Sequence, residues 1–191
     1  MNSDIQNHLA SIAKGDVDAM EEIYNSLSVR VFNYARVITK SKEMSEDITH
    51  DVFMQILEKA VRIADTADPI AYIMVITRNQ SYDYLKNNCR SAELHESIYE
   101  ESAASFAYES MFVWDALSRL PADQQEAVYL HYIAGFTYKE TAKITGSSLI
   151  TTKRKSAKAL SQLRDYFNQH EEENCNEYCE DIARYNNQKT S

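Results

Sequence analysis

Apolar residues recur every three to four positions along most of the chain, which is the spacing that puts them on one side of an α-helix. This pattern predicts helices over 5–14, from near Val17 onward, over 45–60 and over 70–88. In the second half it predicts helices over 109–119 and 122–134, then two shorter ones on either side of Gly146. No stretch alternates with a period of two. We therefore predict an all-α fold.

Two segments lack the helical pattern. Residues 89–114 are rich in Ser, Ala and Glu and carry only scattered large apolar residues, which is typical of a linker leading into the next helix. Residues 171–191 have an excess of Glu, Asn and Gln, so we expect an acidic, disordered tail. The chain is thus predicted to form two small helical domains, over 1–88 and 115–170, joined by a flexible linker.

The composition narrows the class of protein. The 191 residues are 44% hydrophobic and 26% charged, as in ordinary globular proteins, and three cysteines are too few for a disulfide framework. The longest apolar stretch, 70–76, is far shorter than the ~20 residues that span a membrane. We therefore expect a cytoplasmic protein without membrane insertion. With three glycines and no catalytic constellation, the sequence predicts neither an enzyme nor a cofactor nor a metal site.

The net charge of −9 conceals one basic segment. Residues 115–170 hold eight basic and five acidic side chains, whereas the tail that follows has a net charge of −4. Because binding to a phosphate backbone needs local positive charge, this segment is the candidate nucleic-acid surface. The order of the charges also suggests a hypothesis in which the tail lies over this segment and competes with phosphates.

A helix-turn-helix is predicted inside the basic segment. Thr137 and Glu140 have the spacing of a capping box, Gly146 can end that helix in a left-handed conformation, and Ser148 can cap the next one. The second helix of this motif enters the major groove of DNA. Its predicted inner side is Leu149, Thr152, Ala159, Leu160 and Leu163. Its predicted DNA-contacting residues are Ser148, Thr151, Arg154, Lys155 and Lys158. The alternative is an ordinary solvated face.

Several motifs resemble a known family. Residues 120–140 resemble the opening of region 4 in the extracytoplasmic-function group of bacterial sigma factors, and 19–24, 45–53, 71–79 and 83–86 resemble its region 2, in the same order. The resemblance covers about 17–88 and 115–166. It implies an RNA polymerase initiation subunit with no active site, in which region 2 docks on the polymerase and captures the melted minus-ten strand. Region 4 would read the minus-thirty-five element of promoter DNA. The resemblance also implies an anti-sigma factor as a partner.

The residues at the matching positions suit these tasks. Polymerase binding is assigned to a polar face of the third helix, formed by Asp47, Asp51 and Gln55. From the spacing alone, an ordinary exposed acidic face is an equally good interpretation of these residues. Holding single-stranded bases needs aromatic platforms beside positive charge. Strand capture is therefore assigned to Tyr72, Arg78, Asn79, Tyr82 and Lys86, with Asn79 as the base-edge contact. Without the resemblance, these tyrosines would be interpreted as packing residues.

The sequence departs from the family pattern at several positions. Tyr72 stands where Trp is common and Val75 where a basic residue is common, which implies weaker or more selective strand capture. In the recognition helix, 150–152 read Ile-Thr-Thr where Gly-Thr-Val is usual, and Lys155 and Lys158 replace arginines. Lysine cannot make the bidentate contact to guanine that arginine makes. Among the predicted contacts, Arg154 is therefore the one residue that can make it.

Two other functions remain open at this point. One is a helix-turn-helix regulator that acts without polymerase, and the other is a degenerate sigma-like interaction protein that cannot open promoters. Cys175, Cys179 and nearby His170 could suggest a metal-responsive tail, but incidental free thiols are the favoured interpretation.

Overall fold

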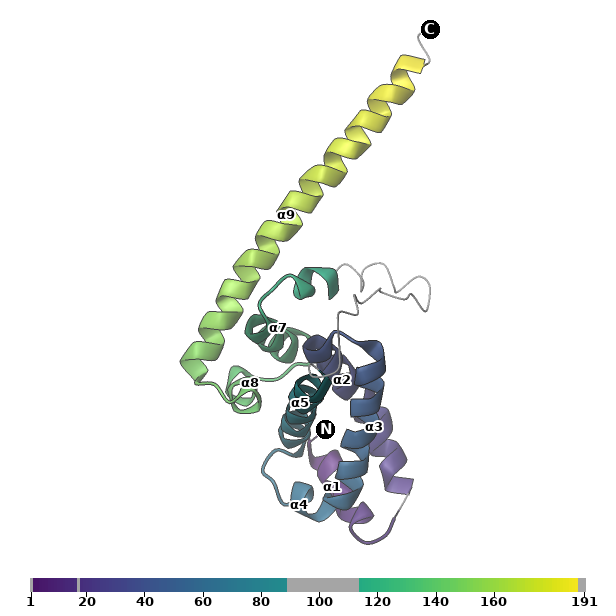
Figure 1. Ribbon diagram of the computed structural model, residues 1–191, viewed down its shortest axis with the longest axis vertical. Helices are drawn as coiled ribbons and strands as arrows, with labels where there is room; N and C mark the ends of the chain where they lie inside the picture. The colour runs from purple at the N-terminus through teal and green to yellow at the C-terminus, as the bar shows by residue number, and fades with distance from the viewer. Residues whose placement is uncertain (1, 17, 89–113, 189–191) are drawn as a thin grey trace.

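The computed structural model describes residues 2–16, 18–88 and 114–188, without the side chains of 2, 88 and 169–188. Every regular element in these ranges is a helix, which confirms the all-α prediction (Figure 1). The N-terminal domain is formed by α1 (Asn2–Ile12), α2 (Asp18–Thr39), α3 (Lys42–Glu58), α4 (Ala60–Ala64) and α5 (Pro69–Asn88). The C-terminal domain is formed by α7 (Ala122–Val128), η1 (Tyr129–Ile133), α8 (Tyr138–Thr145) and α9 (Leu149–Gln188).

Capping side chains set the helix starts in the N-terminal domain. The Ser41 hydroxyl accepts from the Met44 amide at 3.3 Å, so α3 begins earlier than the predicted residue 45. The Asp68 carboxylate accepts from the Ala71 amide at 3.1 Å, which confirms the predicted cap of α5. The helices then bury their apolar stripes against one another, with the most deeply buried side chains including Leu9, Ile23, Leu27, Ile48 and Ile73.

The predicted helix-turn-helix is confirmed. Thr137 and Glu140 form the reciprocal capping box of α8, with the Glu140 amide donating to the Thr137 hydroxyl at 3.3 Å and the Thr137 amide donating to the Glu140 carboxylate at 2.7 Å. Gly146 ends α8 at φ 64°, a left-handed conformation that costs glycine nothing. The Ser148 hydroxyl accepts from the Thr151 amide at 3.1 Å and starts α9.

The predicted helix over 122–134 changes its winding halfway. After Val128 the chain forms a single π-helical turn, closed by the Ala134 amide donating to the Tyr129 carbonyl at 2.8 Å. Such turns insert one residue and are hard to recognise from periodicity, because the apolar spacing changes only locally. Tyr129 and Leu130, which belong to this turn, are fully buried.

α9 continues without a break to Gln188, where the sequence predicted a disordered tail from 171. No glycine or proline lies between Leu149 and Gln188, so no residue of either type ends the helix. Its second half projects away from both domains (Figure 1). Glu171 follows Lys158 by thirteen positions, or roughly 20 Å along the axis. The tail therefore does not lie over the basic segment, contrary to the hypothesis drawn from charge order.

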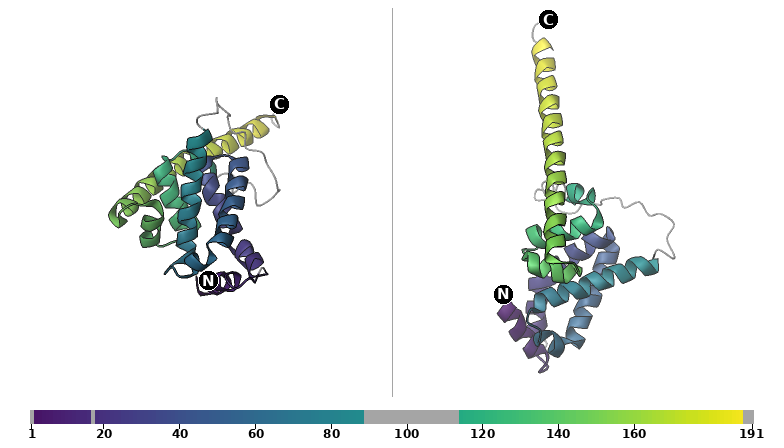
Figure 2. Two further views of the ribbon diagram at one scale, coloured as in Figure 1. Left: turned by 60° about the horizontal axis from the view of Figure 1, so that its bottom comes forward. Right: turned by 90° about the vertical axis from the view of Figure 1, so that its left-hand side faces the viewer.

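The two domains pack against each other, which the sequence did not predict. Phe136 and Ile144 of the C-terminal domain join the buried cluster of the N-terminal domain, together with Tyr129 and Leu130. Within it, the rings of Tyr34 and Tyr129 stack in parallel with centroids 5.7 Å apart. Figure 2 shows α7 and α8 lying against α2 and α5, in agreement with the contacts between these helices.

None of the helices in the described ranges has the length and apolar character to cross a membrane.

Candidate functional site

The exposed stripe of α9 differs from the predicted one by about one position. It runs through residues spaced three and four apart, and the side that packs inward starts at Thr152 and Ser156, which are fully buried with Ala159. The exposed residues that form the stripe are Ile150, Lys153, Arg154, Ala157, Lys158 and Ser161. Leu149 and Leu160, which were predicted to face inward, are 42% and 38% exposed. We call this surface the cationic stripe.

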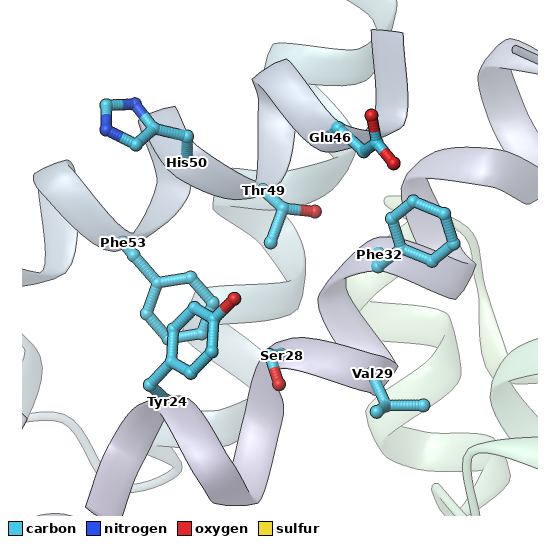
Figure 3. A pocket seen from close by; sticks show the side chains of 8 residues that line it. All are labelled: Tyr24, Ser28, Val29, Phe32, Glu46, Thr49, His50 and Phe53. Carbon is cyan, nitrogen blue, oxygen red and sulfur yellow. The ribbon is translucent and has the colours of Figure 1, made fainter. Parts of the chain in front are cut away.

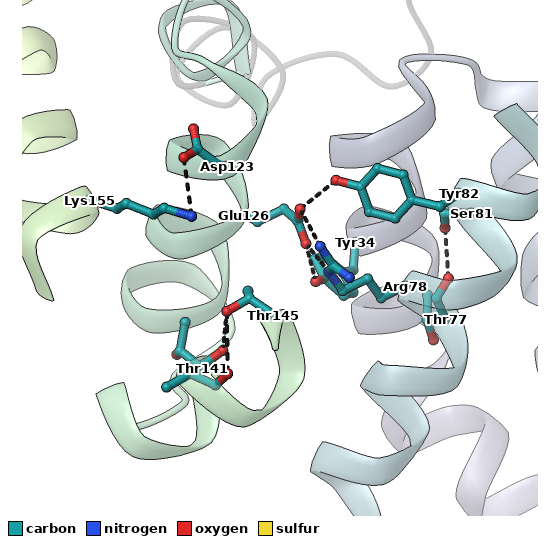
Figure 4. Close-up of polar contacts among 11 residues, drawn as sticks. Tyr34, Thr77, Arg78, Ser81, Tyr82, Asp123, Glu126, Thr141, Thr145 and Lys155 are labelled. Carbon is teal, nitrogen blue, oxygen red and sulfur yellow. Dashed lines mark hydrogen bonds and ion pairs between the residues drawn. The ribbon is translucent and has the colours of Figure 1, made fainter. Parts of the chain in front are cut away.

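Three of the predicted DNA contacts of α9 have partners inside the domain. The Lys155 ammonium lies 3.1 Å from the Asp123 carboxylate of α7, and its side chain is only 27% exposed (Figure 4). Ser148 and Thr151 share a hydrogen bond between their hydroxyls at 2.8 Å and form the start of the helix. Arg154 and Lys158 are exposed as predicted.

The sequence did not predict Lys153 of the cationic stripe or the aromatic cluster beside it. Lys153 is exposed, and its ammonium lies 5.9 Å from the ring of Tyr138 at the start of α8. Tyr138 stacks on His131 at 3.7 Å, and its hydroxyl shares a hydrogen bond with that of Tyr132 at 2.9 Å. The helical spacing of Lys153 with Arg154 and Ala157 was the signal that could have found it.

The residues assigned to strand capture divide into three groups on α5. Tyr72 is half-buried and packs against the core, as does Val75. Asn79 and Lys86 are exposed. Arg78 and Tyr82 point toward the C-terminal domain and bind Glu126 of α7 (Figure 4).

Glu126 is the centre of a buried polar cluster between the domains. Its side chain is only 3% exposed and accepts four hydrogen bonds from three residues. The Tyr34 hydroxyl donates at 2.7 Å, the Tyr82 hydroxyl at 2.6 Å, and the Arg78 guanidinium at 2.7 and 3.4 Å. The Arg78 guanidinium also lies 4.7 Å from the centroid of the Tyr82 ring. The sequence does not predict this cluster, because Tyr34 and Tyr82 lie 92 and 44 residues away from Glu126 along the chain.

Burial and the Glu126 carboxylate make the phenols of this cluster harder to ionise. They raise the pKa of Tyr82 from 10.0 to about 12, and that of Tyr34 well above 10.0. Each phenol keeps its proton to a higher pH in the packed arrangement than when it is exposed. A rising pH therefore favours the exposed, ionised form and weakens the packing. The interdomain contact is therefore expected to hold its full strength below pH 10 and to weaken between pH 10 and about 12.

We predict that Tyr82 ionises late. Subtracting the alkaline absorbance titration of Tyr82→Phe from that of the wild-type chain is expected to leave a tyrosinate step near pH 12. A difference step near 10 would contradict the placement of Tyr82 against Glu126.

The polar face of α3 carries the residues assigned to polymerase binding. Asp47 is exposed, and Asp51 is half-exposed and accepts from the Tyr84 hydroxyl of α5 at 2.8 Å. This bond raises the pKa of Tyr84 to about 12. Gln55 accepts from the Lys59 ammonium at 3.1 Å. Asp47 is thus the acid of this face whose charge is most available to a partner.

An apolar groove lies beside these acids, between α2 and α3. Its volume is about 380 Å³, and Tyr24 and Val29 on its edge are 50% and 67% exposed. The lining residues are Tyr24, Ser28, Val29, Phe32, Glu46, Thr49, His50 and Phe53 (Figure 3). Asp47 and Asp51 directly follow Glu46 and His50 in the chain, so they lie about 100° round the helix from the groove. We call the groove and these acids the α3 docking face.

No cluster of three or more His, Cys, Asp or Glu residues is placed to hold a metal ion within the part of the chain that the structure describes. The side chains of Cys175, Cys179 and His170 lie outside that part.

Comparison with known proteins identifies both domains. Residues 23–91 match the family model described as Sigma-70 region 2, and residues 113–163 match Sigma-70, region 4. The chain is 23% identical over 177 residues to the ECF RNA polymerase sigma factor SigK of Mycobacterium sp. (strain JLS), covering 86% of this chain and 91% of SigK. It is 24% identical over 156 residues to SigM of Bacillus subtilis (strain 168), covering 78% and 95%.

Solved structures show the same fold. The sigma factor RpoE from Bartonella quintana, in a co-crystal with the anti-sigma factor NepR, matches with a TM-score of 0.70 and 22% identity over 80% of this chain and 98% of RpoE. CnrH, in complex with the cytosolic domain of CnrY, matches with a TM-score of 0.64 and 19% identity over 87% and 98%. The two family models together cover more than half of the chain. The chain therefore belongs to the extracytoplasmic-function group of bacterial RNA polymerase sigma factors, a family of non-enzymatic transcription factors that direct core polymerase to promoters.

Proposed function

We propose that this sigma factor reads duplex promoter DNA with the cationic stripe of α9 and captures the melted strand with α5. The observation that carries the first part is the stripe itself. Arg154, Lys153 and Lys158 are exposed on the second helix of a capped helix-turn-helix, in the one basic segment of a chain with a net charge of −9. Arg154 supplies the fork for guanine, and the exposed Ile150 supplies methyl groups for contact with thymine.

Strand capture by α5 is supported by the chemistry of its surface. Asn79 and Lys86 are exposed and offer a two-sided amide and a cation. Tyr82 and Arg78 add an aromatic ring and a guanidinium on the same helix, the combination that holds single-stranded bases. Tyr72 and Val75 pack against the core, so their contribution is to position the helix rather than to stack on bases.

We assign core polymerase binding to the α3 docking face. Its groove offers apolar surface to an incoming helix, and Asp47 offers a charge for a basic side chain at the edge. The partners proposed for this chain are core RNA polymerase, promoter DNA and an anti-sigma factor. The last is suggested by RpoE and CnrH, whose structures contain NepR and CnrY. The function requires no active site or cofactor in the chain, and its place of action is the cytoplasm.

Run-off transcription tests this function directly. The purified full chain is mixed with core RNA polymerase and a library of promoter fragments, and transcripts are sequenced. Defined start sites that depend on the chain are the expected result. Duplex binding without transcripts would favour a regulator that acts without polymerase, and polymerase binding without transcripts would favour a degenerate sigma-like protein.

Asp47→Arg is predicted to weaken binding to core polymerase by at least about tenfold. Reversing a charge at an interface places like charges together and removes an attraction. Fluorescence titration of labelled protein with core polymerase measures the change. Asp65→Arg, an equal change at an exposed position after α4, is the control and should bind as wild type does. Equal affinities for all three proteins would show that this end of α3 does not face the polymerase.

A further inference from the structure

We propose that the first turn of α9 reads the C5-methyl groups of pyrimidines in duplex DNA with Leu149 and Ile150, which we call the apolar tip. The proposal rests on the duplex reading assigned above to the cationic stripe. It goes further by making the affinity for a promoter depend on whether its cytosines carry a methyl group at C5. The usual residue at position 150 in the family pattern is glycine, so this contact belongs to this chain in particular.

The apolar tip is exposed where a packed helix would bury aliphatic side chains. Ile150 is 81% exposed, the highest value among the large hydrophobic side chains in the described ranges, and its neighbour Leu149 is 42% exposed. The inward side of the same turns holds Thr152 and Ser156 instead, both of them buried. Apolar surface in water is unfavourable, so two adjacent exposed aliphatic side chains indicate a site for an apolar ligand.

The cap of α9 holds the apolar tip in place. The Ser148 hydroxyl accepts from the Thr151 amide at 3.1 Å, and the Ser148 carbonyl accepts from the amide and the hydroxyl of Thr152 at 2.9 and 3.0 Å. These bonds close the first turn around the tip. Isoleucine is branched at Cβ and keeps one main rotamer in a helix, so Ile150 presents its methyl groups in a fixed position and loses little entropy on contact.

The charges beside the apolar tip favour DNA as its partner. Lys153 follows Leu149 by four positions, and Arg154 follows Ile150 by four, so each pair lies on one side of α9. Both cations are exposed. A major groove has anionic phosphates along its edges and thymine methyl groups on its floor. Exposed cations one turn from exposed aliphatic groups are complementary to that surface.

The helical spacing determines which base pair the tip reaches. Arg154 is the residue assigned to guanine, and the four residues from Ile150 to Arg154 span about 6 Å along the axis. Successive bases of one strand are about 3.4 Å apart along the duplex. The methyl group that Ile150 contacts is therefore expected within about two base pairs of the guanine that Arg154 contacts.

The ligand of the tip is the methyl group rather than one particular base. Thymine presents its C5-methyl group in the major groove, whereas cytosine has only a hydrogen atom at C5. Methylation of cytosine at C5 places the same group on the same ring atom. Because an apolar contact depends on the surface that it buries, thymine and 5-methylcytosine both provide the ligand and cytosine does not.

The test starts from the duplex that the full chain selects from a randomised pool, and from the guanine in it whose preference is lost in Arg154→Lys. Within two base pairs of that guanine, each thymine is replaced by deoxyuridine, which removes only the methyl group. Each cytosine is replaced by 5-methylcytosine, which adds only that group. Fluorescence anisotropy measures every affinity. Ile150→Ser removes the aliphatic side chain, and Val61→Ser, at a 61% exposed position of α4, is the matched control.

The methyl group is expected to raise the affinity of the wild type and of Val61→Ser by about fourfold at one of these positions, the effect of burying one such group. In Ile150→Ser, the methylated and unmethylated forms of that base should bind equally. The absence of a methyl effect at every position would overturn the proposal. A methyl effect that persists in Ile150→Ser would overturn it as well.

Other partners of the tip would give different results. If Ile150→Ser weakens binding to core polymerase and no methyl effect is seen, the tip contacts protein and the proposal fails. It also fails if no methyl effect is seen and wild-type sedimentation, unlike that of Ile150→Ser, depends on concentration, because the tip then joins two copies of the chain. A guanine preference without a methyl effect would leave the proposed duplex reading intact and end the methyl reading alone. A selection without any preferred duplex would end both.

Discussion

Replacing Tyr129 by alanine is expected to lower the free energy of unfolding of the full chain by about 3–5 kcal/mol, the range for truncating a fully buried aromatic side chain. Tyr129 is 1% exposed and contacts three residues on two other parts of the chain. Its ring stacks on Tyr34 of α2 and packs on Trp114, and its hydroxyl reaches the Arg30 carbonyl at 3.1 Å. The cavity left by alanine would lie in the cluster that both domains share.

Tyr129→Phe is the matched control. It keeps the ring and loses one hydrogen bond, so the expected loss is about 1 kcal/mol. Urea denaturation followed by circular dichroism measures both variants. The wild-type chain should unfold in one step, because the shared cluster couples the domains, and the alanine variant in two. A loss below about 1 kcal/mol, or a wild-type chain that already unfolds in two steps, would show that the domains do not share this cluster in solution.

The sequence predicted those features that local chemistry determines. The capping box at Thr137, the left-handed Gly146 and the Asp68 cap are confirmed because each depends on residues three or four positions apart. The exposed acid at Asp47 and the exposed cations at Arg154 and Lys158 followed from helical spacing in the same way. Such features need no knowledge of distant partners.

The features that the sequence missed depend on contacts across the chain. Glu126 has the pattern of a surface acid, and its burial becomes apparent only when Tyr34, 92 residues away, is placed beside it. Lys155 was assigned to DNA contact from its helical spacing. Its ion-pair partner Asp123 lies on another helix, so no local pattern reveals the pair. The π-turn at Tyr129 shifts the helical phase by one residue, which no periodic pattern anticipates. Long-range packing therefore changed the interpretation of the very residues to which function had been assigned.

The corrected placement separates two neighbours on α9 that the sequence treated alike. Arg154 is exposed on the cationic stripe, whereas Lys155 is paired with Asp123 at 3.1 Å. A bidentate contact from arginine to guanine contributes about 1–3 kcal/mol of discrimination, or roughly 5- to 150-fold in affinity. Each phosphate contact instead contributes about −0.9 to the slope of log affinity against log salt. The two kinds of contact can therefore be told apart by measurement.

Arg154→Ala is predicted to reduce affinity for the selected duplex by roughly 5- to 150-fold and to relax the preference at one base pair. Arg154→Lys should keep the salt slope of the wild type and still lose that preference, because it retains the charge without the fork. Lys155→Ala should change neither the base preference nor the salt slope, since the Lys155 ammonium is paired with Asp123. Lys158→Ala should reduce the slope by about 0.9. Fluorescence anisotropy over a salt series, on duplexes selected from a randomised pool, measures all four. A base preference that survives in Arg154→Lys, or a salt slope that falls in Lys155→Ala, would mean that the recognition helix meets DNA along a different stripe.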